Sequence, residues 1–385
     1  MQKLPSQEQI QAALGGVLDP EIRRPITELG MVRSAEVRPD GTALVTVLLT
    51  VAGCPMRETL TRDVTKALTE LPGVTAVDVT LDVMSAEQRQ ELQGRLRGGG
   101  PAKENPFTKP DSLTRVYAVA SGKGGVGKSS VTVNLAVAMA NQGLKVGLLD
   151  ADVYGHSVPA MLGIADVRPT RVEDMIMPVP AYDVKVMSIG MLKPGRQHVV
   201  AWRGPMLDRA LGQMLSDVYW GDLDVLLLDL PPGTGDMAIS VGQQLTNADV
   251  IVVTTPQEAA AEVAERAGTI ASMLHQKVTG VVENMSWLPC PHCGSTHRID
   301  VFGTGGGTRV AATLSERLGY DVPLLGEIPL DPRLRTGGDA GLPVVLDDPG
   351  APASEILHAL AKELADRRPS LVGRSLGITP TNGRS

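Results

Sequence analysis

Hydrophobic residues near the start of the chain recur at the spacing of an amphipathic helix. Ser6 followed by Gln9 is a capping-box pattern. The apolar residues that follow are spaced as on one face of a helix: Ile10, Ala13, Leu14, Val17 and Leu18. Residues 42–51 follow a Pro-Asp-Gly turn and are rich in β-branched side chains, which predicts a strand. A helical stretch at 60–71 and an alternating strand at 74–83 come next. We therefore predict a small α/β domain over residues 1–95.

The pattern changes at residue 113. Short apolar runs, typical of strands buried on both faces, alternate with helical or loop segments and occur at 116–120, 146–149, 225–228, 250–254 and 278–282. This alternation predicts an α/β fold with a doubly wound, mostly parallel sheet. Residues 354–366 have one apolar face and are expected to form the closing helix. The second domain is therefore predicted to span 113–367.

Two segments lack any such periodicity. Residues 96–112 are rich in Gly, Pro and charge, which predicts a flexible linker between the domains. Residues 368–385 have little apolar surface to bury and are predicted to be a disordered tail. Two domains and their connections fit a chain of 385 residues.

A phosphate-binding loop is predicted where the first strand of the second domain meets its first helix. The motif occupies 122–129 and reads Gly122, Lys123, Gly124, Gly125, Val126, Gly127, Lys128 and Ser129. Its glycines let backbone N–H groups surround phosphate oxygens, and Ser130 continues the site into the helix. Lys128 is expected to reach the β- and γ-phosphates without a packing role, and Ser129 to bind Mg²⁺. A glycine-rich turn without a ligand is the alternative, but the full motif in this context favours ATP.

Carboxylates follow two of the predicted strands. Asp150 and Asp152 come after the run at 146–149, and Asp229 ends the run at 225–228 in the Walker B arrangement, which holds Mg²⁺ through water. The loop at 231–236 ends at Asp236 and is predicted to sense the γ-phosphate, with Gly233 as its hinge. A single aspartate at a strand end is more often a turn or cap residue. Several of them beside a phosphate-binding loop favour one catalytic site.

Lys123 departs from a plain phosphate-binding loop. A second lysine there resembles the deviant loop of the ATPases related to nitrogenase iron protein, MinD and ParA. The resemblance implies that Lys123 reaches the nucleotide of the other subunit in a dimer. It also implies that Asp152 orients the attacking water and that Asp150 supports it. A solvated surface lysine is the alternative for Lys123.

The chain has three cysteines, Cys54, Cys290 and Cys293. Cys290 and Cys293 form a CPxCG knuckle, in which two thiolates can converge on one metal. Cysteine-ligated iron–sulfur clusters generally need four ligands, and two knuckles from a symmetric dimer would supply them. A mononuclear zinc site completed by His292 or His297, or a redox pair, stays open as an alternative.

The motifs of the second domain, in their order and spacing, resemble the Mrp-type iron–sulfur cluster carrier ATPases. The matching segments lie at 150–155, 231–236, 283–286, 290–294 and 302–307. The resemblance implies an ATP-binding homodimer that receives a labile [4Fe–4S] cluster from a scaffold or donor, holds it through Cys290 and Cys293, and passes it to apo-proteins. Asn284 resembles the family's adenine-contacting residue. His156 stands where many relatives have Pro, from which we expect no loss of function.

The first domain resembles the small metal–sulfur cluster assembly domain often fused to these carriers. Its matching features lie at 19–21 (Asp-Pro-Glu), 29–32 and 53–55. Cys54 is therefore either an exposed thiol that contacts a cluster or partner, or a buried structural cysteine.

Charge and composition narrow the expected partners. A formal net charge of −7 argues against nucleic acid, and no apolar run approaches the roughly 20 residues of a membrane span. A polar start and few cysteines indicate a cytoplasmic protein. The alternative function is a ParA- or MinD-type positioning ATPase with a structural zinc knuckle. Such a protein should carry a basic face or a terminal amphipathic helix, which Pro369 and Gly373 would interrupt.

Overall fold

The structure is a computed structural model that describes residues 4–50, 56–85, 87–89, 91–92, 105–109, 111–153, 155–192, 204–233, 235–274, 276–290 and 292–367. The chain divides into two compact units. The first contains Met1–Glu104, Asp166–Pro180 and Ser216–Gly221, and the second contains Asn105–Ala165, Ala181–Leu215 and Asp222–Ser385.

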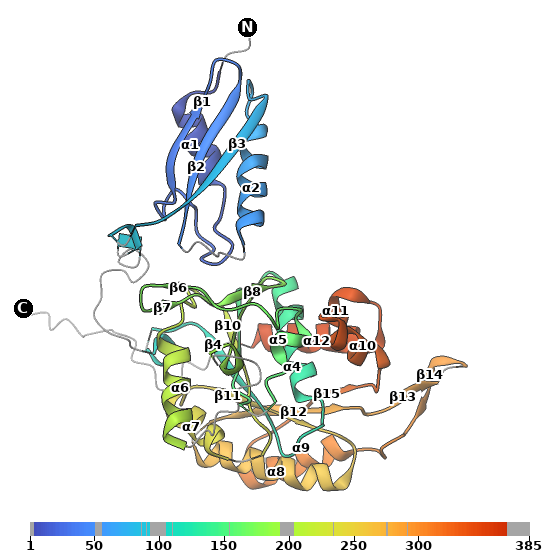
Figure 1. Ribbon diagram of the computed structural model, residues 1–385. Helices are drawn as coiled ribbons and strands as arrows, with labels where there is room; N and C mark the ends of the chain where they lie inside the picture. Colours follow the sequence, from blue (N-terminus) through green and yellow to red (C-terminus); the bar gives the residue numbers. More distant parts are fainter. Residues whose placement is uncertain are drawn as a thin grey trace, which may run out of the picture. The chain divides into compact units, whose positions relative to one another are not determined.

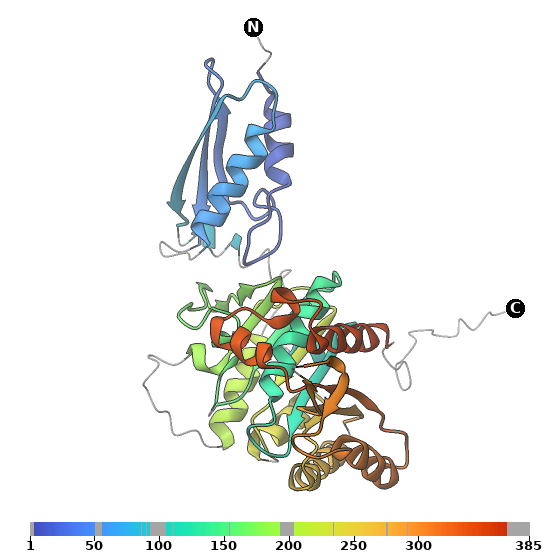
Figure 2. The same cartoon turned by 90° about the vertical axis from the view of Figure 1, so that its right-hand side faces the viewer.

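A three-stranded sheet with the order β1-β2-β3 forms the first unit, and Figure 2 shows its two helices on one face of that sheet. The elements are α1 (Gln7–Gly15), β1 (Val32–Val37), β2 (Thr42–Leu49), α2 (Arg57–Thr69) and β3 (Ala76–Val83). The capping box of α1 is confirmed, because Ser6 accepts from the Gln9 N–H and the Gln9 side chain accepts from the Ser6 N–H. Strand β1 was not predicted, since Ala35 is its one buried residue. The short pair β6 (Arg171–Val172) and β7 (Met175–Ile176) also belongs to this unit.

An eight-stranded sheet dominates the rest of the chain (Figure 1). Its order is β15 (Leu324–Ile328), β12 (Val278–Asn284), β11 (Asp249–Thr254), β4 (Arg115–Ser121), β10 (Val225–Asp229), β5 (Val146–Asp150), β9 (Val184–Ser188) and β8 (Val179–Ala181). All six pairings from β15 to β9 are parallel. The predicted mostly parallel, doubly wound sheet is therefore confirmed. Strand β4 lies between β11 and β10, so the loop that follows it starts near the middle of the sheet.

Helices cover both faces of this sheet, and Figure 1 shows α4 (Lys128–Asn141) and α12 (Pro352–Asp366) on one face and α8 (Glu258–Met273) and α9 (Gly306–Leu318) on the other. Most of α4 is buried, including Leu135 and Val137 at 0% exposure. A helix buried in this way provides a rigid base for the loop at its amino terminus. Further helical elements are α5 (Val158–Met161), η2 (Ile189–Leu192), α6 (Gly204–Ser216), α7 (Asp236–Gln244), α10 (Pro332–Ala340) and α11 (Val344–Asp347).

Part of the predicted linker packs against the second unit. Residues Pro106–Thr108 form a short 3₁₀ turn, η1, and Phe107 is buried at 2% exposure. The Asn247 side chain donates to the Phe107 carbonyl at 2.8 Å. The rest of the linker before residue 105, the tail at 368–385 and Cys54 lie outside the described residues. The domain boundaries drawn from the sequence stay predictions.

Candidate functional site

The phosphate-binding loop connects strand β4 to helix α4. Gly125 and Gly127 have φ values of +82° and +77°, a region that favours glycine. Gly127 also lies against Asn284, because a Cβ built on it would be 2.2 Å from the Asn284 Nδ2 atom. Helix α4 begins at Lys128, so the N–H groups of its first turn are available to phosphate oxygens. The loop therefore has glycine at two positions whose backbone conformation favours it, followed directly by the amino terminus of a helix.

Three side chains of α4 converge on the carboxylate that ends β10. The Lys128 Nζ atom lies 2.6 Å from Asp229 Oδ1, and Ser129 Oγ donates to Asp229 Oδ2 at 2.6 Å. Thr132 Oγ1 donates to Asp229 Oδ1 at 3.0 Å. Asp229 is fully buried and Lys128 is 5% exposed. The structure therefore places the predicted phosphate-binding lysine and the two predicted Mg²⁺ ligands in direct contact.

Neighbouring strands bring two further polar side chains to this edge of the sheet. Asp229, Asp150 and Ser188 are register partners on β10, β5 and β9, and all are fully buried. Ser188 Oγ donates to Asp150 Oδ2 at 2.9 Å and accepts from the Gly190 N–H at 3.1 Å. Burial is the largest cause and repulsion from Asp229 the second, and together they raise the pKa of Asp150 to about 8. Ser188 was missed in the sequence, where Lys185 interrupts the apolar residues of 184–187 and no continuous apolar run marks the strand.

The loop after β5 is tied to the same buried carboxylate. The Asp152 N–H donates to Asp150 Oδ1 at 3.1 Å, and Asp152 Oδ1 accepts from the Gly155 N–H at 2.9 Å. Asp152 is 7% exposed. Asp150 thus hydrogen-bonds the backbone of Asp152, and the catalytic roles expected of the two residues stay predictions.

Lys123 does not join the cluster around Asp229. Its side chain is partly exposed, and its Nζ atom contacts Gln257 Oε1 at 3.1 Å. Gly233 has a φ of +91°, and its N–H donates to the Ser121 carbonyl at 2.8 Å. Asp236 is the first residue of α7, and its side chain lies outside the described residues. The expected roles of Lys123 and Asp236 therefore stay predictions.

A cavity of about 610 Å³ adjoins the phosphate-binding loop; it is lined by Gly127, Ser130, Ser157, Ala160, Met161, Asn284, Met285, Pro329, Leu330, Asp331, Leu334, Arg335, Gly338 and Asp339. Asn284 Nδ2 donates to the Val126 carbonyl at 2.9 Å, whereas its Oδ1 atom is buried without a hydrogen-bond partner. A buried acceptor of this kind fits the exocyclic amino group of a purine base. Residues 329–339 were missed in the sequence, because no local motif marks them as part of this cavity.

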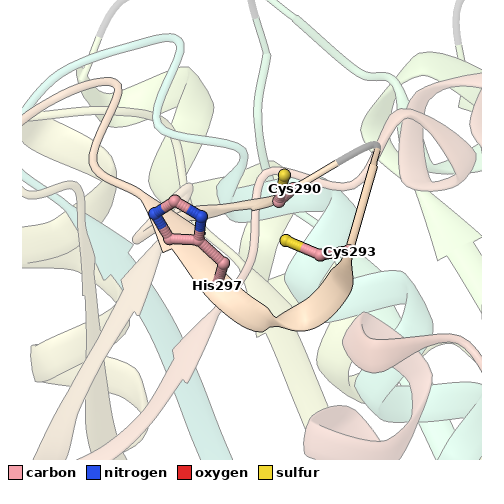
Figure 3. Close-up of side chains that lie close together, drawn as sticks. All are labelled: Cys290, Cys293 and His297. Atoms are coloured by element: carbon pink, nitrogen blue, oxygen red, sulfur yellow. The ribbon is translucent and has the colours of Figure 1, made fainter.

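The two knuckle cysteines lie at the end of a hairpin formed by β13 (Leu288–Cys290) and β14 (Gly294–Ile299). Both are thiols, Cys290 buried and Cys293 exposed. The ligand atoms of Cys290, Cys293 and His297 lie within 4.8 Å of one another (Figure 3). Hydrogen bonds from the His292 and Cys293 N–H groups lower the pKa of Cys290, and a hydrogen bond with Cys290 raises the pKa of Cys293. His292, which the sequence left as an alternative ligand, is not part of this group.

No helix among the described residues is long and apolar enough to cross a membrane.

Comparison with known proteins identifies both parts of the chain. Residues 112–365 match a family model described as NUBPL iron-transfer P-loop NTPase, and residues 7–79 match one described as iron–sulfur cluster assembly protein. An iron–sulfur cluster carrier protein of Mycobacterium tuberculosis is 60% identical over 97% of this chain and 96% of its own length. The protein of the same description from Deinococcus radiodurans is 44% identical over 92% of this chain and 93% of its own length.

A solved structure supports the same grouping. It is a nucleotide-binding protein from Archaeoglobus fulgidus in complex with ADP, 37% identical, with a TM-score of 0.52 over 62% of this chain and 91% of its own. The resemblances noted in the sequence are thereby confirmed for both units. The P-loop geometry, the cysteine hairpin and these matches establish that the chain belongs to the family of iron–sulfur cluster carrier P-loop NTPases.

Proposed function

We propose that the protein binds and hydrolyses ATP with Mg²⁺ and carries a [4Fe–4S] cluster that it transfers to apo-proteins. Membership of the carrier family supports this proposal. The observation that carries it is the pair of thiols, Cys290 and Cys293, at the end of a hairpin whose first strand begins three residues after Met285, a residue of the cavity. The family match does not favour the alternative of a positioning ATPase with a structural zinc knuckle.

The cavity beside Gly127 is proposed to hold the base and ribose of ATP. The unpartnered Oδ1 atom of Asn284 can accept from the adenine amino group, and the exposed Arg335 side chain, which also lines the cavity, can donate to the ribose. The Archaeoglobus fulgidus relative was solved with ADP, which is consistent with this assignment. The phosphates would then lie on the glycine loop, whose positions run from Gly122 to Ser130.

Hydrolysis is proposed to depend on the polar residues at the carboxyl edge of the sheet. Lys128 and the N–H groups of the loop neutralise charge on the phosphates. Ser129 and Asp229 have oxygen donors that fit Mg²⁺, with Asp229 acting through water; the ion would stabilise negative charge on the phosphate oxygens. Asp152 orients the attacking water, and Asp150 holds the loop that carries it. Asp236 is proposed to respond to the γ-phosphate.

The cluster is proposed to be held between two copies of the chain. Each copy offers two thiols in one hairpin, whereas a [4Fe–4S] cluster generally takes four cysteine ligands. A symmetric dimer that brings two hairpins together meets this requirement without any other residue type. In the same dimer, Lys123 would reach the nucleotide of the partner subunit. This role fits the position of Lys123 beside Gln257, apart from the side chains that contact Asp229.

A short chain segment connects the nucleotide cavity to the cysteines. Met285 lines the cavity with a φ of +57°, and the Ser286 N–H donates to the Ile328 carbonyl at 2.9 Å. Next along the chain, the Trp287 carbonyl accepts from the N–H of Leu330, another cavity residue, at 2.7 Å. Cys290 follows three residues later. We propose that this segment makes the affinity of the hairpin for its cargo depend on the nucleotide.

The first unit is proposed to act as a separate module that selects cluster donors or recipients. Its match to the iron–sulfur cluster assembly family supports this role, and Cys54 is its candidate for cluster contact. The proposed partners are a cluster scaffold or donor and apo iron–sulfur proteins, and the proposed location is the cytoplasm.

A transfer assay tests the proposed function. The cluster-loaded protein would be mixed with an apo-enzyme that needs a [4Fe–4S] cluster, and recovery of that enzyme's activity would be followed with and without ATP. We expect recovery with the parent and none with Cys290→Ser. Equal recovery with both proteins, at the level given by free iron and sulfide, would contradict the proposal.

A further inference from the structure

The cysteine hairpin contains a third side chain with a metal-binding atom. The Cys290 thiol, the Cys293 thiol and an imidazole nitrogen of His297 all lie within 4.8 Å of one another, and no other group of this kind occurs among the described residues. Figure 3 shows the three side chains around one space at the end of the hairpin, with the Cys293 sulfur turned toward the other two. All three belong to one chain.

An irregularity in the hairpin brings His297 to this position. Pro289 is the register partner of Arg298, but the next residue, Cys290, is the partner of Gly294. Residues 295–297 are therefore extra residues of β14, and bulges of this kind redirect side chains. His297 is one of them.

The neighbouring residue anchors β14 next to His297. The Arg298 guanidinium lies 4.4 Å from the centroid of the Trp287 ring, within cation–π distance, and 3.7 Å from the Glu327 carboxylate. Trp287 is buried at 6% exposure, so it provides a fixed surface for Arg298. The position of His297 thus follows from the bulge and from this anchor.

Two sulfurs and one imidazole nitrogen form a ligand set that suits divalent ions of borderline softness, such as Zn²⁺ or Fe²⁺. In a tetrahedral site with bonds of about 2.0–2.3 Å, neighbouring ligand atoms lie roughly 3.3–3.8 Å apart. The observed distances of at most 4.8 Å exceed this range by no more than about 1–1.5 Å, so side-chain rotation has to bring the three atoms closer together on one ion. Cys293 and His297 are exposed, so the fourth position would be open to solvent.

We propose that His297 is the third protein ligand of a site that holds one divalent cation within a single protomer. The proposal rests on the metal-binding role given above to Cys290 and Cys293. In this additional metal-bound state, a single protomer binds the ion without a second subunit and without sulfide. Each thiol releases one proton as it binds, and no oxidation occurs. Because the ion and the cluster use the same two sulfurs, they exclude each other, and the open fourth position lets the ion exchange.

Cobalt binding tests this proposal, since tetrahedral Co²⁺ with thiolate ligands has characteristic visible absorption. The full chain, freed of metal and kept reduced under anaerobic conditions, would be titrated with Co²⁺. His297→Ala removes the proposed ligand, whereas His292→Ala removes an exposed histidine of the same turn that is outside the group. Nucleotide binding by each variant reports that it is folded.

We expect one Co²⁺ per chain, with a tetrahedral spectrum, in the parent and in His292→Ala. His297→Ala should bind Co²⁺ at least roughly 10–100-fold more weakly, because losing a residue that only hydrogen-bonds a metal ligand already lowers metal affinity by that factor. The visible spectrum of its Co²⁺ complex should also change. Parental affinity and spectrum in His297→Ala would overturn the role of His297.

Cys290→Ser separates this proposal from the proposed function. If Co²⁺ binding is lost in Cys290→Ser but unaffected in His297→Ala, the cysteine site stands and the third ligand is wrong. If Cys290→Ser binds Co²⁺ as the parent does, the metal role of the cysteine pair itself fails, and this proposal fails with it.

Discussion

The ammonium group of Lys128 lies 2.6 Å from the carboxylate of Asp229, and both side chains are buried. The same carboxylate accepts a hydrogen bond from Ser129 at 2.6 Å. A buried cation and anion in contact stabilise each other, and removing one of them leaves an uncompensated charge in the protein interior. Lys128 therefore contributes to the stability of the site as well as to its proposed chemistry, contrary to the expectation from the sequence that it has no packing role.

Lys128→Ala should lower ATP turnover by a factor of roughly 10²–10³ or more, because one positive charge on the phosphates is lost. It should also destabilise the protein by about 3–5 kcal/mol, because Asp229 is left without its cation. Turnover and thermal unfolding measure the two effects. The double variant Lys128→Ala/Asp229→Asn should regain stability but not turnover. Parental turnover in Lys128→Ala would contradict the assignment of the site.

Lys123→Ala should lower ATP turnover with little change in stability, since the side chain is partly exposed and its contact with Gln257 is a single hydrogen bond. If Lys123 acts on the nucleotide of the partner subunit, an equal mixture of Lys123→Ala and Lys128→Ala should regain activity. Half of the dimers would then be mixed, each with one complete site, which gives about a quarter of parental turnover. A mixture as inactive as its components would contradict action across the dimer.

The buried Asp150 predicts a pH dependence of stability. Its pKa is about 8 in the folded protein against an ordinary value of 3.8, so the folded state holds the proton more tightly. The resulting stabilisation is complete below pH ~4 and is lost as the pH rises through about 8. The midpoint temperature of thermal unfolding should therefore fall between about pH 5 and pH 8 in the parent, and it should fall less in Asp150→Asn. Asp222→Asn, an exposed control, should follow the parent. An equal fall in all three proteins would contradict this account.

The segment from Met285 to Cys290 predicts reciprocal coupling between nucleotide and metal. ADP affinity should differ by roughly fivefold or more between metal-free and Co²⁺-loaded protein, a typical size for coupled sites. Arg298→Gln removes the contact with the Trp287 ring and should reduce that factor toward one. Arg317→Gln, an exposed arginine on α9 that pairs with Glu265, serves as the control. Identical ADP affinity with and without metal would show that the two sites are independent.

Local patterns were enough to predict the parallel sheet, the phosphate-binding loop and the carboxylates at the strand ends. Continuous apolar runs mark the five strands β4, β5, β10, β11 and β12, and parallel strands bring their carboxyl ends to one edge. The three outer strands β8, β9 and β15 were not predicted from the sequence. Ser188 and the cavity residues around Leu330 were missed, because they belong to the site only through strand order and packing. The sequence could not choose between His292 and His297, since the choice depends on the register of a bulged hairpin.

Metal and sulfide content after anaerobic reconstitution is the most direct test of the central claim, that Cys290 and Cys293 from two subunits hold one [4Fe–4S] cluster. The parent should contain about four irons and four sulfides per dimer, with the mass of a dimer, whereas Cys290→Ser and Cys293→Ser should contain almost none while still binding ATP. One metal ion per chain that stays bound through reconstitution, with no sulfide and a monomeric mass, would contradict the claim.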